Sequence, residues 1–148
     1  MGNNPKSGCI FCDALAQADG PDNLIVTRSP LTFVMMNRYP YTSGHIMVVP
    51  NDHQPSLELL DAATRAELME TVAHGIQVMR LVYKPEGFNV GVNIGAVSGA
   101  GVADHVHMHI VPRWAGDTNF MSTLAGARVL PEALENSFRR LREAWNKV

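Results

Sequence analysis

The hydrophobic and polar positions of this chain follow two different periods, and the period separates predicted strands from predicted helices. In five places, apolar residues alternate with polar ones or form short runs between turn residues. Such segments are typical of β-strands. The predicted strands span residues 23–28, 31–36, 45–49, 88–94 and 105–113.

Helical spacing of apolar residues appears in other parts of the chain. A short helix begins near Ile10 and is closed by Gly20-Pro21. Residues 57–83 predict a short helix followed by a long one. A final helix carries an apolar stripe formed by Leu134, Phe138, Leu141 and Trp145. His74 falls off the stripe of the long helix, so we expect it to be a solvated residue without a chemical role.

Together these elements predict a single α+β domain over residues 1–148. Its helices are expected to pack on one side of an antiparallel sheet of about five strands. Residues 1–7 are expected to form a flexible polar leader, and residues 115–148 a C-terminal loop and helix. The sequence contains no repeat and no low-complexity tract that would indicate a second domain.

Composition and charge narrow the class of protein. A hydrophobic content of 46% and a charged content of 18% fit a globular chain. The formal net charge of −2 argues against a dedicated nucleic-acid binder, so we expect no nucleic-acid partner. No apolar run approaches the length of a membrane span, and the first residues lack a hydrophobic signal region. We therefore expect no membrane association and a cytoplasmic location.

The chemistry is concentrated in the last predicted strand, where His105, His107 and His109 alternate with aliphatic residues. Alternate side chains on a strand lie about 6.6 Å apart on one face. One reading is a metal-dependent hydrolase that uses His105 and His107 as ligands, although a single ion cannot reach all three rings. The other reading gives each histidine its own task, with His107 as a central nucleophile. An ordinary strand would not need three imidazoles on one face.

Further motifs accompany the histidines in a fixed order, and together they resemble the histidine triad (HIT) family of nucleotide hydrolases and transferases. The resemblance runs from about Gly8 to Trp114. The motifs are Cys9-Ile-Phe-Cys12, Asn37-Arg-Tyr-Pro40, Gly44-His-Ile-Met-Val-Val-Pro50, Asn93 and His105-Val-His-Met-His-Ile-Val111. The resemblance implies the α+β fold of that family and a homodimer that joins two sheets.

The resemblance also implies catalytic roles. The middle histidine, His107, would attack the α-phosphorus of a nucleotide and become nucleotidylated. Neutral imidazole is a usable nucleophile at neutral pH without a metal. The backbone carbonyl of His105 would hold the proton on the other ring nitrogen of His107. His109 and His45 would complete the polar lining of the site.

The same resemblance assigns substrate contacts. Asn37 matches a position, Asn or Asp, that binds ribose hydroxyls, and the alternative is a plain turn residue. The loop before the triad is rich in glycine, which lets backbone N–H groups approach phosphate. Gly101 and Val102 stand where the family often has a phosphate-binding serine or threonine. The residues expected to contact substrate are Asn37, Asn93, Ser98, Gly99, Ile10, Phe11, Met35 and Met47, the last four lining the purine pocket.

The two cysteines of the chain, Cys9 and Cys12, are too few for a disulfide scaffold. A close pair suggests metal or redox chemistry, and zinc is favoured because the pair opens the domain instead of following a strand. Two further ligands are needed. Family members with this pair use the equivalents of His53 and His105, which implies a structural zinc held by Cys9, Cys12, His53 and His105. No organic cofactor is expected.

The predicted activity is cleavage of dinucleoside polyphosphates through a nucleotidyl-histidine intermediate. The segment after the triad resembles bacterial members similar to diadenosine tetraphosphate phosphorylases. Phosphate is the favoured acceptor, because an attacking anion needs cations and donors, and these could come from Arg38, Arg113, Thr118 and Asn119. The alternatives are a hydrolase of adenosine phosphoramidates or AMP conjugates, and a nucleotide-binding partner protein without significant turnover.

Overall fold

The computed structural model describes residues 8–38, 44–117 and 132–148. Its centre is one antiparallel sheet with the strand order β1-β2-β3-β5-β4. Among the residues described, no helix has the length and hydrophobicity needed to cross a membrane. The strands are β1 (Ile25–Arg28), β2 (Thr32–Met36), β3 (Ile46–Pro50), β4 (Gly87–Val92) and β5 (Met108–Arg113).

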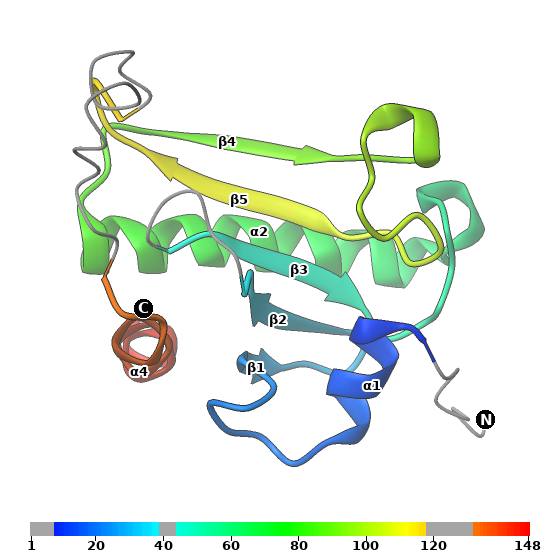
Figure 1. The fold of residues 1–148 in the computed structure, drawn as a ribbon, viewed down its shortest axis with the longest axis horizontal. Coiled ribbons are helices and arrows are strands. Elements are labelled where there is room, and N and C mark those ends of the chain that lie inside the picture. The colour runs from blue at the N-terminus through cyan, green and yellow to red at the C-terminus, as the bar shows by residue number, and fades with distance from the viewer. Residues whose placement is uncertain (1–7, 39–43, 118–131) are drawn as a thin grey trace.

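The described residues also form three α-helices. Figure 1 shows α2 running along the sheet, with α1 and α4 near opposite ends of the strands. Helix α2 contacts β2, β3 and β5, while α4 contacts α2 and β1. The helices are α1 (Ile10–Ala16), α2 (Ala62–Tyr83) and α4 (Leu134–Trp145), and short 3-10 turns are η1 (Leu57–Leu59) and η2 (Ala96–Ser98).

Helix α2 has clear local start and stop signals. The side chain of its N-cap, Asp61, accepts a hydrogen bond of 2.7 Å from the backbone N–H of Thr64. Lys84 ends the helix in a left-handed conformation. Gly75 lies where α2 meets the sheet, and a Cβ there would stand 3.0 Å from Cδ1 of Ile110. The missing side chain therefore lets α2 lie close on the sheet.

The strand register separates two faces of the sheet. Ile46 is paired with Ile110, and both side chains reach the α2 side near Gly75. Neighbouring residues on a strand point to opposite faces, so Met47 and its partner His109 lie on the face away from α2. Met35 is paired with Met47 and extends the same row. The sheet thus buries one apolar face and presents the histidines on the other.

The predicted α+β class and the five-stranded antiparallel sheet are confirmed. The triad strand differs in its start, because β5 begins at Met108 and not at His105. The backbone N–H of Val106 donates to the carbonyl of Gln54 at 2.8 Å, so the chain pairs with a loop there. Residues 1–7 of the expected leader and 118–131 of the expected C-terminal loop lie outside the described residues.

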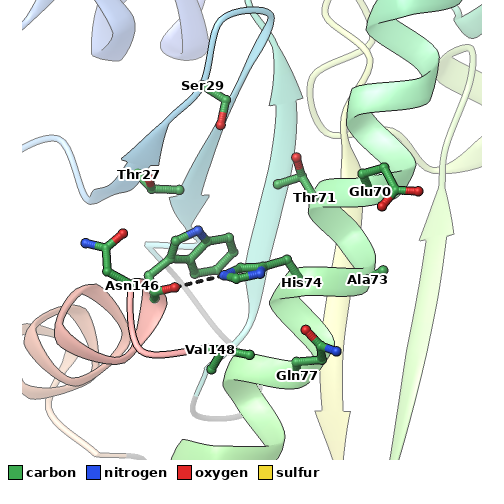
Figure 2. Close-up of a pocket in the computed structure, with 10 residues that line it drawn as sticks. Thr27, Ser29, Glu70, Thr71, Ala73, His74, Gln77, Asn146 and Val148 are labelled. Atoms are coloured by element: carbon green, nitrogen blue, oxygen red, sulfur yellow. Dashed lines mark hydrogen bonds between the residues drawn. The ribbon is translucent and has the colours of Figure 1, made fainter.

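The prediction that His74 is a solvated residue was wrong. Its Nε2 lies 2.8 Å from the backbone carbonyl of Trp145, and its ring lies 5.0 Å from the Trp145 ring. Figure 2 shows His74 pointing from α2 toward the end of α4, beside a pocket that none of the predicted site residues lines. Because α4 is remote in sequence, the position of His74 on its own helix could not reveal this contact.

Candidate active site

His107 is held in one orientation by the backbone just before it. Its Nδ1 lies 2.9 Å from the carbonyl oxygen of His105, so Nδ1–H donates and Nε2 keeps its lone pair. This is the hydrogen bond expected for a nucleophile. Burial lowers the pKa of His107, with the hydrogen bond to the His105 carbonyl opposing it. The ring is therefore neutral at pH 7.

Phe11 forms the wall behind His107. Its side chain is fully buried, and its ring centroid lies 4.7 Å from that of His107 and 5.3 Å from that of His105. Because α1 carries Phe11, the short N-terminal helix braces both imidazoles. Phe11 is therefore a support of the nucleophile, and its neighbour Ile10, 53% exposed, is the better placed of the two to meet a ligand.

His109 and His45 form a coupled pair on the same face as His107. His45 Nε2 lies 2.9 Å from His109 Nδ1, and Asn37 Nδ2 lies 3.2 Å from His45 Nδ1. The His107 and His109 rings are T-shaped with centroids 4.7 Å apart. Burial, reinforced by His109 and His107, lowers the pKa of His45 to about 4. Burial and His107 also lower the pKa of His109.

The imidazole of His105 serves a different purpose. It is fully buried, and its Nε2–H donates to the carbonyl of Pro50 at 2.8 Å. Its Nδ1 faces a sulfur–nitrogen cluster, 3.4 Å from Cys9 Sγ and 3.2 Å from His53 Nδ1. Burial lowers its pKa to about 4, and the Pro50 hydrogen bond opposes this. Only the His105 carbonyl faces the nucleophile, so a direct catalytic role for its side chain does not fit the geometry.

The four predicted metal ligands do come together. One donor atom from each of Cys9, Cys12, His53 and His105 lies within 4.8 Å of the other three. Bond lengths of about 2.3 Å to sulfur and 2.0–2.1 Å to nitrogen place tetrahedral zinc ligands about 3.3–3.6 Å apart for N···N and S···N pairs. The contacts are 3.2 Å for His53 to His105, 3.3 Å for Cys12 to His53 and 3.4 Å for Cys9 to His105. A zinc ion fits this donor set.

Local structure explains why the cysteines are paired. Cys9 is the N-cap of α1, and its Sγ accepts from the backbone N–H of Cys12 at 3.5 Å. A spacing of three residues puts both sulfurs on one side of the first helical turn. The hydrogen bond from His105 to Pro50 fixes the ligand tautomer, as carbonyl partners of metal-bound histidines do.

The methionines predicted for a purine pocket are close to the histidines. Met47 is the register partner of His109, and Met35 is the partner of Met47, so the three side chains form one row. Met35 and Met47 are 7% and 6% exposed. Gly91 continues the row beyond His109 on β4, with open space where a Cβ would stand. Sequence reasoning missed Gly91, whose only signal is its position two residues before Asn93.

The loop after β4 is organised by Asn93. Its Nδ2 donates to the carbonyl of Ser98 at 3.2 Å, and Ser98 Oγ donates to the carbonyl of Gly95 at 2.6 Å. Gly99 has a φ of +89°, a conformation that suits glycine. The pairing of β4 with β5 ends at Val92 and Met108, the residues that adjoin Asn93 and His107 in the chain. The predicted residues Asn93, Ser98 and Gly99 therefore belong to one internally bonded loop that begins where the pairing of β4 with β5 ends.

The expectation that Arg113 supports an attacking anion at His107 was wrong within this chain. Its guanidinium binds both oxygens of Asp117 at 2.7 and 2.8 Å and donates to Asn89 at 2.7 Å. Six residues of strand separate it from His107, which is about 20 Å. Arg38 donates to the carbonyl of Asp22 at 2.8 Å, and Thr118 and Asn119 lie outside the described residues.

The fold and the site together define a class of α+β proteins. In this class the sheet presents a neutral imidazole, oriented by a backbone carbonyl, beside two histidines that are hydrogen-bonded to each other. The chain belongs to the HIT family, whose HIT domain model matches residues 19–116. It is 40% identical over 131 residues to an AP-4-A phosphorylase from Mycobacterium tuberculosis, covering 88% of this chain and 67% of that protein. These matches confirm the family that the motifs indicated.

Two other similarities bear on the site. An asymmetrical bis(5'-nucleosyl)-tetraphosphatase from Schizosaccharomyces pombe is 32% identical over 90 residues, which is 61% of this chain and 49% of that protein. The crystal structure of a Zn-bound histidine triad family protein from Mycobacterium smegmatis superimposes with a TM-score of 0.76 at 26% identity. The superposition covers 99% of this chain and 96% of that one.

Proposed function

We propose that this protein cleaves dinucleoside polyphosphates of the diadenosine tetraphosphate type through a nucleotide bound covalently to His107. The observation that carries the proposal is the hydrogen bond from His107 Nδ1 to the His105 carbonyl. It leaves Nε2 with a lone pair in a buried and neutral ring, which is what a nucleophilic imidazole requires.

In the first step, His107 Nε2 attacks the α-phosphorus of the substrate. A nitrogen–phosphorus bond forms, the bond from phosphorus to the bridging oxygen breaks, and ATP leaves with that electron pair. In the second step an acceptor oxygen attacks the same phosphorus and the nitrogen–phosphorus bond breaks. Water as acceptor releases a proton to the solvent and gives AMP, and inorganic phosphate gives ADP. His107 returns to its neutral form in either case.

The surroundings of His107 support a nucleotide as substrate. Met35 and Met47 supply a polarisable apolar surface for a purine base, and Ile10 on α1 is a further, exposed apolar side chain. Asn37 follows β2 directly, its side chain contacts His45, and we expect it also to reach the ribose hydroxyls. The loop of Asn93 and Ser98 offers backbone and side-chain polar groups for the phosphates.

The acceptor is expected to be inorganic phosphate. The support for phosphate comes from the similarity to an AP-4-A phosphorylase. It does not come from Arg113, because that side chain binds Asp117. Phosphate should raise turnover of diadenosine tetraphosphate and give ADP and ATP, while slower hydrolysis without phosphate should give AMP and ATP. Chromatography of the products with phosphate, and with sulfate at equal ionic strength as control, measures this. A rate indifferent to phosphate, with AMP throughout, would make the protein a plain hydrolase.

We also propose that the cluster of Cys9, Cys12, His53 and His105 holds a structural zinc ion. When bound, the ion would link the first turn of α1 to the residue whose carbonyl orients His107. All four positions of a tetrahedral site are taken by protein atoms, so the ion offers no open position for substrate. The His105 carbonyl orients the nucleophile, and His107 is the residue that attacks phosphorus.

A homodimer is proposed from the open edge of the sheet. Strand β4 is the outermost strand beside β5, and its six residues carry no charged side chain. Val90 on β4 is 42% exposed, as is Ile94 just beyond it. A long apolar edge without charges is a ready template for pairing with another strand. Pairing of β4 with β4 of a second copy would join the two sheets.

Val90→Lys should therefore convert a dimer into a monomer, because it puts a buried charge into the joined edge. Light scattering coupled to size-exclusion chromatography measures the mass. Leu59→Lys is the matched control, since Leu59 is 53% exposed but lies on η1, away from β4. A monomeric wild type, or a Val90→Lys variant that stays dimeric, would contradict this interface.

A further inference from the structure

The polar contacts around His109 extend beyond the triad to Asn37. The His45 ring joins the two ends of this chain of contacts. Its Nδ1 lies 3.2 Å from Asn37 Nδ2, and its Nε2 lies 2.9 Å from His109 Nδ1. Asn37 and His45 are also joined by a backbone hydrogen bond of 3.0 Å, from the N–H of Asn37 to the carbonyl of His45. Backbone and side chains therefore fix Asn37 against His45.

We propose that Asn37 is a positioning residue that sets the proton positions of His45 and His109, so that His109 presents Nε2–H to the leaving group. This inference rests on the proposed function only for the identity of that leaving group. It gives Asn37 a task beyond contact with ribose.

The direction of each hydrogen bond follows from the chemistry of the partners. An amide nitrogen carries two hydrogens and can only donate, so His45 Nδ1 must accept. A neutral imidazole has one proton, which therefore sits on His45 Nε2. That nitrogen donates to His109 Nδ1, which must accept in turn. The single proton of neutral His109 is thereby fixed on its Nε2.

The consequence is a pair of neighbouring neutral imidazoles with opposite polarity. His107 donates through Nδ1 to a carbonyl and keeps a lone pair on Nε2, while His109 accepts at Nδ1 and carries its proton on Nε2. Their rings lie 4.7 Å apart. One ring can attack phosphorus while the other donates a hydrogen bond to the bridging oxygen as it departs. Both rings are neutral before the attack, and His107 becomes positively charged only when its Nε2 bonds to phosphorus, with Nδ1–H still held by the His105 carbonyl.

Turning the Asn37 amide over would reverse the direction of both hydrogen bonds. If Oδ1 of Asn37 faced His45, the proton of His45 would lie on Nδ1, and His45 Nε2 would accept from His109 Nδ1–H. His109 Nε2 would then carry a lone pair and could not donate to the leaving group. The two arrangements differ at all four ring nitrogens, so they can be told apart directly.

Nitrogen-15 NMR of the histidine rings decides between the two arrangements. Long-range proton–nitrogen spectra of labelled wild type at pH 7 should show protonated Nε2 and unprotonated Nδ1 in both His45 and His109, with signals assigned from His45→Ala and His109→Ala. In Asn37→Leu, which keeps the shape but removes the donor, both tautomers of His109 should appear. A wild-type His109 protonated on Nδ1, or unchanged tautomers in Asn37→Leu, would overturn the proposal.

Kinetics separate this task from ribose binding. Only His109 that is protonated on Nε2 can donate to the leaving group, so kcat is proportional to the fraction of that tautomer. With both tautomers present in Asn37→Leu, kcat should fall about twofold or more. The fall should appear equally with a dinucleotide lacking the 2′- and 3′-hydroxyls, which a purely ribose-binding Asn37 could not produce. A loss confined to the substrate with intact ribose would overturn the role in the reaction. If no nucleotide is cleaved at all, the proposed function fails, while the NMR result still decides the tautomers.

Discussion

His107→Ala is expected to lower kcat for diadenosine tetraphosphate by at least about 10³-fold, because the covalent step loses its nucleophile. Binding should change little, since base, ribose and phosphates are held by other groups. Steady-state kinetics gives the first quantity. Titration with a non-cleavable analogue, in which methylene groups replace bridging oxygens, gives the second.

His74→Ala is the control for this substitution. It removes a different imidazole, which is half-buried, but His74 joins α2 to α4 and lies outside the site. Its kcat should equal that of the wild type at a temperature where both variants are folded. Retention of more than about a tenth of wild-type kcat in His107→Ala would exclude His107 as the nucleophile.

The second large effect concerns the metal cluster. Protein purified without added zinc should contain about one equivalent per chain, and Cys12→Ser should lose it. Metal binding by ligands that are scattered in the unfolded chain adds directly to the free energy of unfolding. Loss of several kcal/mol in a chain of this size lowers the melting temperature by on the order of 10 °C.

Elemental analysis and thermal melts measure these quantities, and a chelator provides the internal control. It should lower the melting temperature of the wild type and leave that of Cys12→Ser unchanged. Activity of the chelated protein should persist until the fold loosens, because zinc only supports the nucleophile from behind. Wild type without zinc, with both thiols freely titratable, would contradict the metal site and leave the His107 mechanism standing.

The fold was largely predictable because its signals are local. The period of two marks the strands, and short connections account for the antiparallel pairing of β1, β2 and β3. The place of β5 between β3 and β4 does not follow from them, because α2 separates β3 from β4 in the chain. Asp61 begins α2 as capping rules anticipate, and Pro85 just after Lys84 marks the end of the helix. The left-handed conformation of Lys84 itself is one that glycine usually takes. The contact of His107 with the His105 carbonyl was implied by the family resemblance, and it is local enough to depend little on the rest of the fold.

What escaped prediction depends on contacts between distant segments. The carbonyl of Pro50 orients His105, and a backbone carbonyl leaves no trace in side-chain patterns. The Gln54 carbonyl holds Val106 outside the sheet for the same kind of reason. The sequence suggested that Arg113 was available to bind an anion, yet the carboxylate of Asp117, four residues later, binds its guanidinium. Side-chain partners of this kind are decided by tertiary structure.

The most direct test of the central claim is the mass of the intact protein during turnover. Wild-type protein mixed briefly with excess diadenosine tetraphosphate in the absence of phosphate, then quenched under conditions that preserve nitrogen–phosphorus bonds, should gain the mass of one AMP group per chain. His107→Ala should gain none. Rapid turnover of wild type with no adduct at any quench time, or equal labelling of His107→Ala, would contradict a nucleotide bound to His107.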